Sequence, residues 1–251
     1  MELQFIRNAT LRIRYHHQCL LLDPYFAAQF SMPSYAGKSR NPLIGLPFPP
    51  HEIINGVQMV LVSHLHSDHF DKAAQSILAK DIPLFCQPHD AAEVANMGFK
   101  SVYPVGQRIA WQGIGIQRTP GQHGSGEVLK EMGPVSGFFL EAPREPSLYW
   151  SGDTVLCDEV RELIATKQPE IIITHSCGAT WGNNRTKIVM DEIQTVAVCK
   201  MAPRSVVVAT HMESLDHATV SRDMLRNYAR KNGIDDERLR IPGAGEILTF
   251  P

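Results

Sequence analysis

The stretch that most constrains this chain is the apolar run Met59–Val62 and the polar residues that follow it. A short apolar run of this kind is typical of a buried strand. While the chain stays extended, His64 and His66 point to the same side, because alternate side chains of a strand share a face. Asp68 and His69 follow where the chain turns, so they can reach a second point nearby. This single loop therefore predicts ligands for two adjacent cations. A single-cation site is the alternative, but it leaves the last two residues without a role.

The pattern resembles the signature of the metallo-β-lactamase superfamily, His-x-His-x-Asp-His followed by a distant His, Asp and His. The downstream members are His123 in Thr119–Gly126, Asp153 in Trp150–Thr154 and His211 in Val206–His211. The resemblance spans nearly the whole chain. It looks closest to the branch that includes L-ascorbate-6-phosphate lactonase, with a more distant likeness to N-acylphosphatidylethanolamine phospholipase D.

The resemblance implies two divalent metal ions as cofactors. By the family pattern, the first ion would be bound by His64, His66 and His123, the second by Asp68, His69 and His211, and Asp153 would bridge both. Imidazole and carboxylate ligands suit zinc, manganese or iron, so the ligand types leave the metal open. The family also places an acid such as Asp23 behind a metal-binding histidine, where the ring needs an acceptor for its second nitrogen. The alternative for Asp23 is a turn residue before Pro24.

Three side chains are candidates for catalytic roles: Asp68, His175 and His217. In a metal pair, a bridging water becomes a hydroxide nucleophile near neutral pH, and Asp68 would sit beside the point of attack. His175 could either support a ligand or touch the substrate. His217 could either contact the substrate or leaving group, or lie with Asp216 at the start of a helix.

The composition is that of an ordinary globular protein, with 251 residues, 43% apolar residues and a net charge of −2. Without a basic excess, a nucleic-acid partner is not expected, and no apolar run is long enough for a membrane span. Five cysteines without CxxC spacing, and an N-terminus without an apolar signal segment, predict a cytoplasmic protein with reduced thiols. The expected partner is a small-molecule substrate, and a homo-oligomer is compatible with the sequence.

The order of predicted elements indicates an α/β (α+β) fold. A β-rich half precedes alternating helices and strands, which predicts two sheets packed face to face with helices outside. The resemblance implies the same four-layer αββα sandwich. We expect one domain over residues 1–251, with two halves joined near 151. The main helices are predicted over 70–80 (capped by Ser67 or Asp71), 158–167, 188–201 and 218–232.

The irregular segment 25–51, rich in proline, is either an apolar lid over the substrate or a strap across the sheet edge. The function predicted from the resemblance and the ligands is a dinuclear hydrolase that opens a small ester or lactone, including one with a phosphate or sugar acid. Phosphodiester hydrolysis is the near alternative, with anion contacts available from Arg40, Arg118, Arg185 and Lys187. A non-catalytic metabolite-binding module is the alternative from another class, and the complete ligand set weighs against it.

Overall fold

The computed structural model describes residues 1–251, and the N-terminal part of the chain builds most of its first sheet. In spatial order the strands are β16 (Ile247–Thr249), β1 (Glu2–Arg7), β2 (Thr10–Tyr15), β3 (Gln18–Leu22), β4 (Met59–Val62), β5 (Leu84–Cys86) and β6 (Val102–Pro104). Pairing is antiparallel from β16 to β3 and parallel from β3 to β6. The outer face is covered by α1 (Pro50–Ile54), α2 (Lys72–Ile77) and α3 (Ala91–Asn96), the last preceded by the 3-10 turn η1 (Pro88–Asp90).

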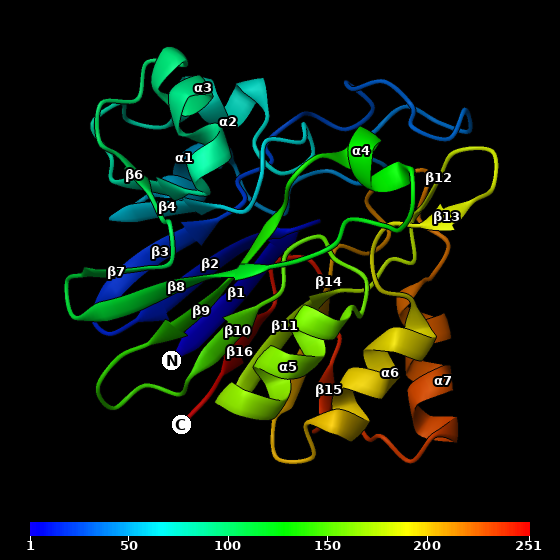
Figure 1. The fold of residues 1–251 in the computed structure, drawn as a ribbon. Helices are drawn as coiled ribbons and strands as arrows, with labels where there is room; N and C mark the ends of the chain where they lie inside the picture. The colour runs from blue at the N-terminus through cyan, green and yellow to red at the C-terminus, as the bar shows by residue number, and fades with distance from the viewer.

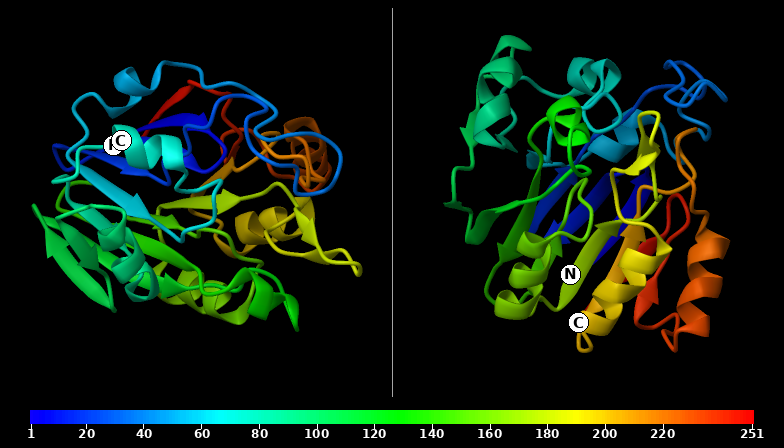
Figure 2. Two further views of the ribbon diagram at one scale, coloured as in Figure 1. Left: turned by 90° about the horizontal axis from the view of Figure 1, so that it is seen from above. Right: turned by 45° about the vertical axis from the view of Figure 1, so that its right-hand side comes forward.

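The second sheet comes from residues 108–240. In spatial order its strands are β15 (Leu239–Arg240), β14 (Val206–Thr210), β11 (Ile171–His175), β10 (Leu148–Trp150), β9 (Ser136–Glu141), β8 (Ile114–Pro120) and β7 (Arg108–Trp111). Its outer face carries α5 (Asp158–Lys167), α6 (Glu192–Met201) and α7 (Arg222–Lys231), which lie side by side in Figures 1 and 2. The short helix α4 (Val128–Met132) and the hairpin of β12 (Thr180–Trp181) and β13 (Thr186–Lys187) lie at one end of the sandwich.

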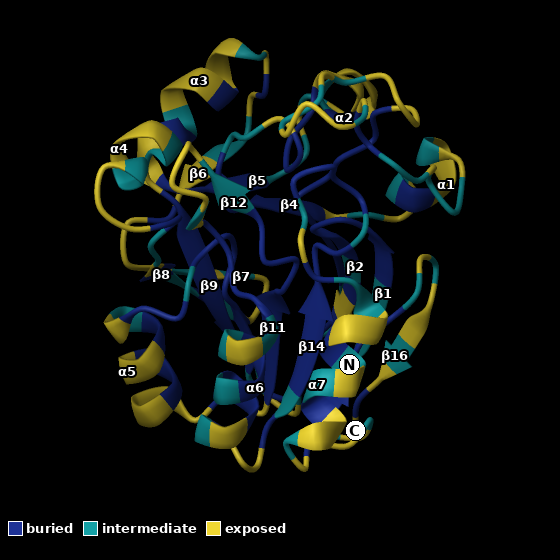
Figure 3. Ribbon diagram, turned by 90° about the vertical axis from the view of Figure 1, so that its right-hand side faces the viewer, coloured by how far each residue is buried: buried dark blue, intermediate teal, exposed yellow.

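The αββα sandwich predicted from the sequence is confirmed. One apolar core lies between the two sheets, a second lies under the helices α1–α3, and a third lies under the helices α5–α7. In Figure 3 the central strands are buried while the outer sides of the helices are exposed. The strand β4 takes part in two cores, because Met59 and Leu61 face the other sheet while Val60 and Val62 face the helices. Burial on both faces explains why its sequence is apolar without alternation.

The chain passes from the first sheet to the second between β6 and β7, rather than near residue 151. The change of pattern at 151 has another cause. At this point the second sheet changes from antiparallel pairing between β9 and β10 to parallel pairing between β10 and β11. Parallel strands need helical connections, which is why helices alternate with strands only after this position. None of the helices combines the length and the hydropathy that crossing a bilayer requires.

Three predicted helices are shorter in the structure than in the sequence analysis. The helix α2 begins at Lys72, with the Asp71 carboxylate as its cap, and not at 70. The helices α6 and α7 begin at Glu192 and Arg222, rather than at 188 and 218. The residues before them are extended because their backbone bonds to residues 177–179, as in the bonds from Ile188 N to Ala179 O and from Val220 N to Cys177 O.

Residues 25–49, here called the strap, contain no helix or strand beyond an isolated bridge between Met32 and Asn41. Among the aromatic side chains of the strap, only Tyr35 lines the cavity at the candidate site. Phe26 is instead buried in the core under α1–α3, and Phe30 is exposed. The segment is therefore a strap across one end of the sandwich that contributes a single aromatic wall.

Candidate metal centre

The predicted ligands all follow the carboxyl ends of strands. His64 comes shortly after β4, His123 after β8, Asp153 after β10 and His211 after β14. These strand ends meet at the same end of the sandwich, so residues that lie far apart in the sequence come together. The structure gathers two groups whose ligand atoms lie within 4.8 Å of one another: His64, His66 and His123 in one, and His69, Asp153, His175 and His211 in the other.

The histidine rings are held with one nitrogen directed away from the centre. His69 Nδ1 lies 2.6 Å from Asp23 Oδ2, and His123 Nδ1 lies 2.8 Å from the Ile188 carbonyl oxygen. Carboxylate and carbonyl oxygens only accept, so both Nδ1 atoms carry the proton. His64 Nδ1 lies 2.9 Å from the Ser63 hydroxyl, which itself donates to Asp23 Oδ2 at 2.6 Å. The hydroxyl therefore accepts from His64, and Asp23 orients two rings, one directly and one through Ser63.

With their protons committed outward, these rings direct the lone pairs of their Nε2 atoms inward. His64 Nε2 is buried without any partner. His211 Nε2 lies 3.2 Å from His69 Nε2 and 3.1 Å from Asp68 Oδ2. Converging lone pairs of buried imidazoles beside carboxylates are costly without a cation, and nitrogen and oxygen donors in this arrangement suit divalent metal ions. The side chains present therefore fit the metal ions that the sequence predicts.

Asp153 belongs to the second group and also lies close to the first. Its Oδ2 is 3.2 Å from His69 Nε2 and 3.5 Å from His123 Nε2, while its Oδ1 is 3.6 Å from His211 Nε2. A carboxylate in this position can reach a cation in either group.

His175 lies behind Asp153, where it is fully buried and does not line the cavity. The Trp150 indole donates to His175 Nε2 at 3.1 Å, so the ring proton is on Nδ1, which lies 2.5 Å from Asp153 Oδ1. Of the two roles left open by the sequence, substrate contact and support of a ligand, the geometry is that of support.

Asn8 is a site residue that the sequence analysis missed. Its side-chain amide donates to the Asp68 backbone oxygen at 2.9 Å and to Asp68 Oδ2 at 3.2 Å, while its backbone carbonyl oxygen accepts from the His211 backbone N–H at 2.8 Å. Asn8 has a φ of +56° in the turn between β1 and β2, a conformation that asparagine tolerates. In sequence it is indistinguishable from an ordinary hairpin residue. A buried cysteine, Cys177, places its Sγ 3.4 Å from His211 Nδ1.

Burial lowers the pKa of His64, His66 and His123, in the last case to about 4. These three rings are neutral at neutral pH, which is the form that binds a metal ion.

The other group behaves in the opposite way. Burial alone would lower the pKa of His69 and His211, but the Asp153 carboxylate raises both well above the usual value. Burial alone would also raise the pKa of Asp153, which these two rings instead hold well below its usual range. Protons and cations compete for the same lone pairs, so metal binding at this group releases protons.

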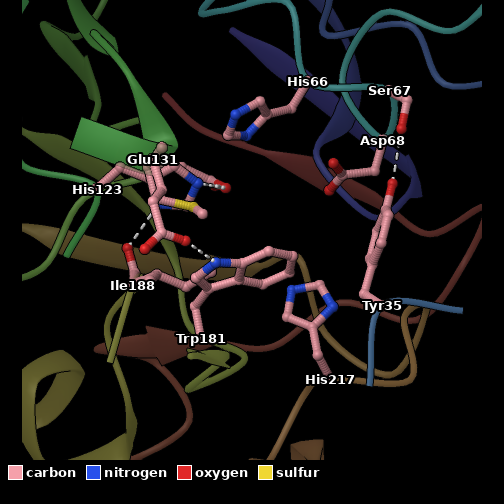
Figure 4. A pocket seen from close by; sticks show the side chains of 11 residues that line it. Tyr35, His66, Ser67, Asp68, His123, Glu131, Trp181, Ile188 and His217 are labelled. Atoms are coloured by element: carbon pink, nitrogen blue, oxygen red, sulfur yellow. Dashed lines mark hydrogen bonds and ion pairs between the residues drawn. The ribbon is translucent and has the colours of Figure 1, made fainter. Parts of the chain in front are cut away.

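A cavity of about 230 Å³, here called the inner cavity, opens onto this centre. Its polar side includes His66, Asp68, His123 and Asp153, and its other walls include Tyr35, Met132, Trp181, Ile188 and His217. Figure 4 shows the His217 ring between Trp181 and Tyr35. Two hydrogen bonds fix the aromatic walls, since Trp181 Nε1 donates to Glu131 Oε2 at 2.8 Å and the Tyr35 hydroxyl lies 2.7 Å from Ser67 Oγ. His217 is not at the start of α7, and it contributes a buried ring with Nδ1 unpartnered.

Asp216, next to His217, anchors the strap rather than capping a helix. Its carboxylate accepts from the backbone N–H groups of Tyr35, Ala36, Lys38 and Ser39 and from the side chains of Ser34 and Asn41. Burial alone would raise the pKa of Asp216, but these donors, the Ser34 hydroxyl first, hold it well below its usual range. The aromatic wall at Tyr35 thus depends on one carboxylate.

We expect Asp216→Asn to lower the free energy of unfolding by about 2 kcal/mol, because an amide nitrogen would face N–H donors. A carboxyl group whose pKa is lower in the folded than in the unfolded protein stabilises the fold fully at pH values above its unfolded-state pKa of about 3.9. This stabilisation is lost only as the pH falls through the lower folded-state pKa. The difference in unfolding free energy between wild type and Asp216→Asn, measured by urea unfolding, should therefore be constant from pH 8 to pH 5. Asp236→Asn, at an exposed carboxylate paired with Arg226 and Arg230, is the control. Equal unfolding energies for Asp216→Asn and wild type would contradict the assignment.

Comparisons with known proteins show the family to which this chain belongs. A profile described as "Beta-lactamase superfamily domain" matches residues 19–212. This chain belongs to the metallo-β-lactamase superfamily. Within it, the UPF0173 protein YddR of Bacillus subtilis is 37% identical over 260 residues, and the match covers 100% of both chains. A UPF0173 metal-dependent hydrolase of Xanthobacter autotrophicus is 21% identical over 183 residues, covering 68% of this chain and 70% of the relative.

Two solved structures share the whole metallo-β-lactamase fold with this chain. A possible metal-dependent hydrolase from Veillonella parvula has a TM-score of 0.96 and 28% identity, with 100% of this chain and 99% of that chain covered. An isothiocyanate hydrolase from Delia radicum gut bacteria has a TM-score of 0.92 and 31% identity, with the same coverage. The protein is therefore a metal-dependent hydrolase of this superfamily. The closer likeness to the ascorbate-6-phosphate lactonase branch stays a prediction.

Proposed function

We propose that this protein is a dinuclear metal-dependent hydrolase that opens a small ester or lactone. The observation that carries the proposal is the pair of adjacent ligand groups, which reach the inner cavity through His66, His123 and Asp153. We assign His64, His66 and His123 to one metal ion, Asp68, His69 and His211 to the other, and Asp153 to both. When bound, such a pair supplies a water that loses its proton near neutral pH and a Lewis acid that polarises the substrate.

The chain's own residues have separate tasks in this proposal. Asp23 and His175 hold the rings and the bridging carboxylate in place by the hydrogen bonds described above, and Asn8 holds Asp68. The walls formed by Met132, Trp181 and Ile188 exclude water and hold the apolar part of the substrate. Burial lowers the pKa of His217, so the ring is neutral at neutral pH. A neutral ring can donate one hydrogen bond to the oxygen on which negative charge develops, and it can guide a proton to the leaving group.

A second candidate substrate is an isothiocyanate. It is favoured by the hydrolase from Delia radicum gut bacteria, which is 31% identical over the whole chain. Water would add to the central carbon of R–N=C=S, and cleavage of the C–N bond would give the amine and carbonyl sulfide. The apolar walls of the inner cavity suit a small apolar R group. Phosphodiester hydrolysis remains the alternative on the same metal pair.

The first experiment measures metal content per chain by elemental analysis of protein purified without chelator. The same sample is tested on 4-nitrophenyl butyrate, γ-butyrolactone, benzyl isothiocyanate and bis(4-nitrophenyl) phosphate. Close to two metal ions with ester or lactone turnover supports the proposal. Turnover of the isothiocyanate or the phosphodiester alone replaces it by the corresponding candidate. If the protein binds no metal even when zinc and manganese are supplied, all three hydrolytic functions are contradicted, and the non-catalytic metabolite-binding module becomes the explanation.

A further inference from the structure

A second cavity of about 440 Å³, here called the outer cavity, adjoins the inner one. The two cavities share Tyr35, Trp181 and His217 among their lining residues. A ligand that fills the inner cavity can therefore extend past these three rings into the outer one.

The two cavities differ in their charges. The inner cavity is lined by Asp68, Asp153 and Glu131, whereas no acidic residue lines the outer cavity. Lys38 and Arg185 line the outer cavity, and neither side chain takes part in an ion pair or hydrogen bond within the protein. The other cations that the sequence offered as anion contacts are occupied elsewhere. Arg40 donates to Phe30 and Ser31 oxygens, Arg118 donates to the Gly106 oxygen, and Lys187 pairs with Asp191.

The two free cations are brought to this cavity by segments with fixed backbones. Lys38 belongs to the part of the strap that Asp216 holds, and its own backbone N–H donates to that carboxylate at 3.2 Å. Arg185 lies in the turn between β12 and β13, where its backbone N–H donates to the Gly182 oxygen at 3.0 Å. The strap and the hairpin are remote in sequence, so their meeting is a property of the fold.

His217 provides an independent sign of a ligand at this junction. Its side chain lines both cavities and is only 8% exposed, yet its Nδ1 has no hydrogen-bond partner. A buried ring nitrogen without a partner is costly unless a bound molecule satisfies it.

We propose that the outer cavity binds a compact anionic group, a carboxylate or a phosphate, at the far end of the substrate whose scissile bond lies in the inner cavity. The guanidinium of Arg185 matches two oxygens of either anion, and the Lys38 ammonium adds a second point charge. Tyr35 and Trp181 flank the connecting atoms. This inference rests on the proposed function for the position of the scissile bond, but the anion site itself depends only on the outer cavity.

The first test compares two esters with the metal-loaded protein: the neutral 4-nitrophenyl butyrate, and 4-nitrophenyl hydrogen glutarate, in which the same acyl chain ends in an added carboxylate. In the double variant Lys38→Gln/Arg185→Gln, the kcat/KM for the glutarate ester should fall about tenfold through KM, as loss of two partly exposed charge contacts implies. Turnover of the neutral butyrate ester should be unchanged. Lys187→Gln, on the same hairpin but paired with Asp191, is the matched control and should alter neither ester. An equal change for both esters in the double variant would overturn the proposal.

The second test does not depend on turnover. Glutarate and 4-phosphonobutyrate are titrated into the same proteins, and binding is followed by tryptophan fluorescence, to which the cavity residue Trp181 contributes. The anion site is supported if the double variant binds these anions more weakly and Lys187→Gln binds them as wild type does. This result would support the site even if neither ester is hydrolysed, and only the proposed ester hydrolysis would then fail. Tighter binding of one anion identifies it as the preferred group. Identical binding by wild type and the double variant contradicts the site.

Discussion

Replacing Asp153 by alanine is expected to remove at least one metal ion per chain and to lower hydrolysis by more than about 1,000-fold, because metal-assisted hydrolysis depends on both ions. The structural reason is the position of this carboxylate. Its two oxygens lie 3.2–3.6 Å from Nε2 atoms of His69, His123 and His211, so it contacts histidines of both groups of ligands. Without it, Asp68 would be the one remaining carboxylate among the assigned ligands, so half of the negative charge that neutralises the two cations would be lost.

Elemental analysis and turnover on the best substrate of the panel measure the two effects together. Asp90→Asn is the control, because Asp90 is another buried carboxylate, bonded to Gln87 away from the ligands. Thermal melting of both variants shows whether the fold survives. Wild-type turnover in Asp153→Ala would rule out a mechanism that uses both metal ions.

The second large effect is expected for His217→Ala, which should keep the full metal content while kcat falls about 100-fold, the scale on which a positioned proton-transfer group acts. His217 lines the cavity but belongs to neither group of ligand atoms. Its removal should therefore affect the reaction and not the binding of the ions. The measurements are metal content, kcat and KM.

His51→Ala, at an exposed histidine of α1, controls for the loss of an imidazole. His217→Gln, which can still donate one hydrogen bond, should recover part of the lost rate. If the metal content of His217→Ala falls together with the rate, His217 binds a metal ion and its assignment here is wrong.

The sequence was most informative where one short stretch carries the information. The apolar run of β4 predicted a buried strand, and the spacing after it predicted a cluster of ligands, because strand geometry fixes which way alternate side chains point. The αββα architecture followed from the order of strands and helices. These features are local or repeat along the chain.

The remaining features depend on contacts between remote segments. Asn8 meets Asp68 and His211, and Asp216 meets the strap 175 or more residues away, as its bond with Asn41 shows. No local pattern distinguishes Asn8 from a turn residue or Asp216 from a helix cap. The starts of α6 and α7 were misplaced for the same reason, since pairing with residues 177–179 replaces the first helical turn in both.

The double burial of β4 has a consequence for how this protein can evolve. One residue inserted or deleted ahead of His64 would exchange the side chains that face the two cores, and it would turn the ligand loop by the same step. Selection for stability and selection for metal binding therefore act on the same residues and leave this stretch little freedom. Apart from Phe26, Leu46 and Phe48, which pack in or against the core under α1–α3, the strap and the β12–β13 hairpin lie outside both cores. New substrate preferences are therefore expected to arise by changes in the other residues of these two segments.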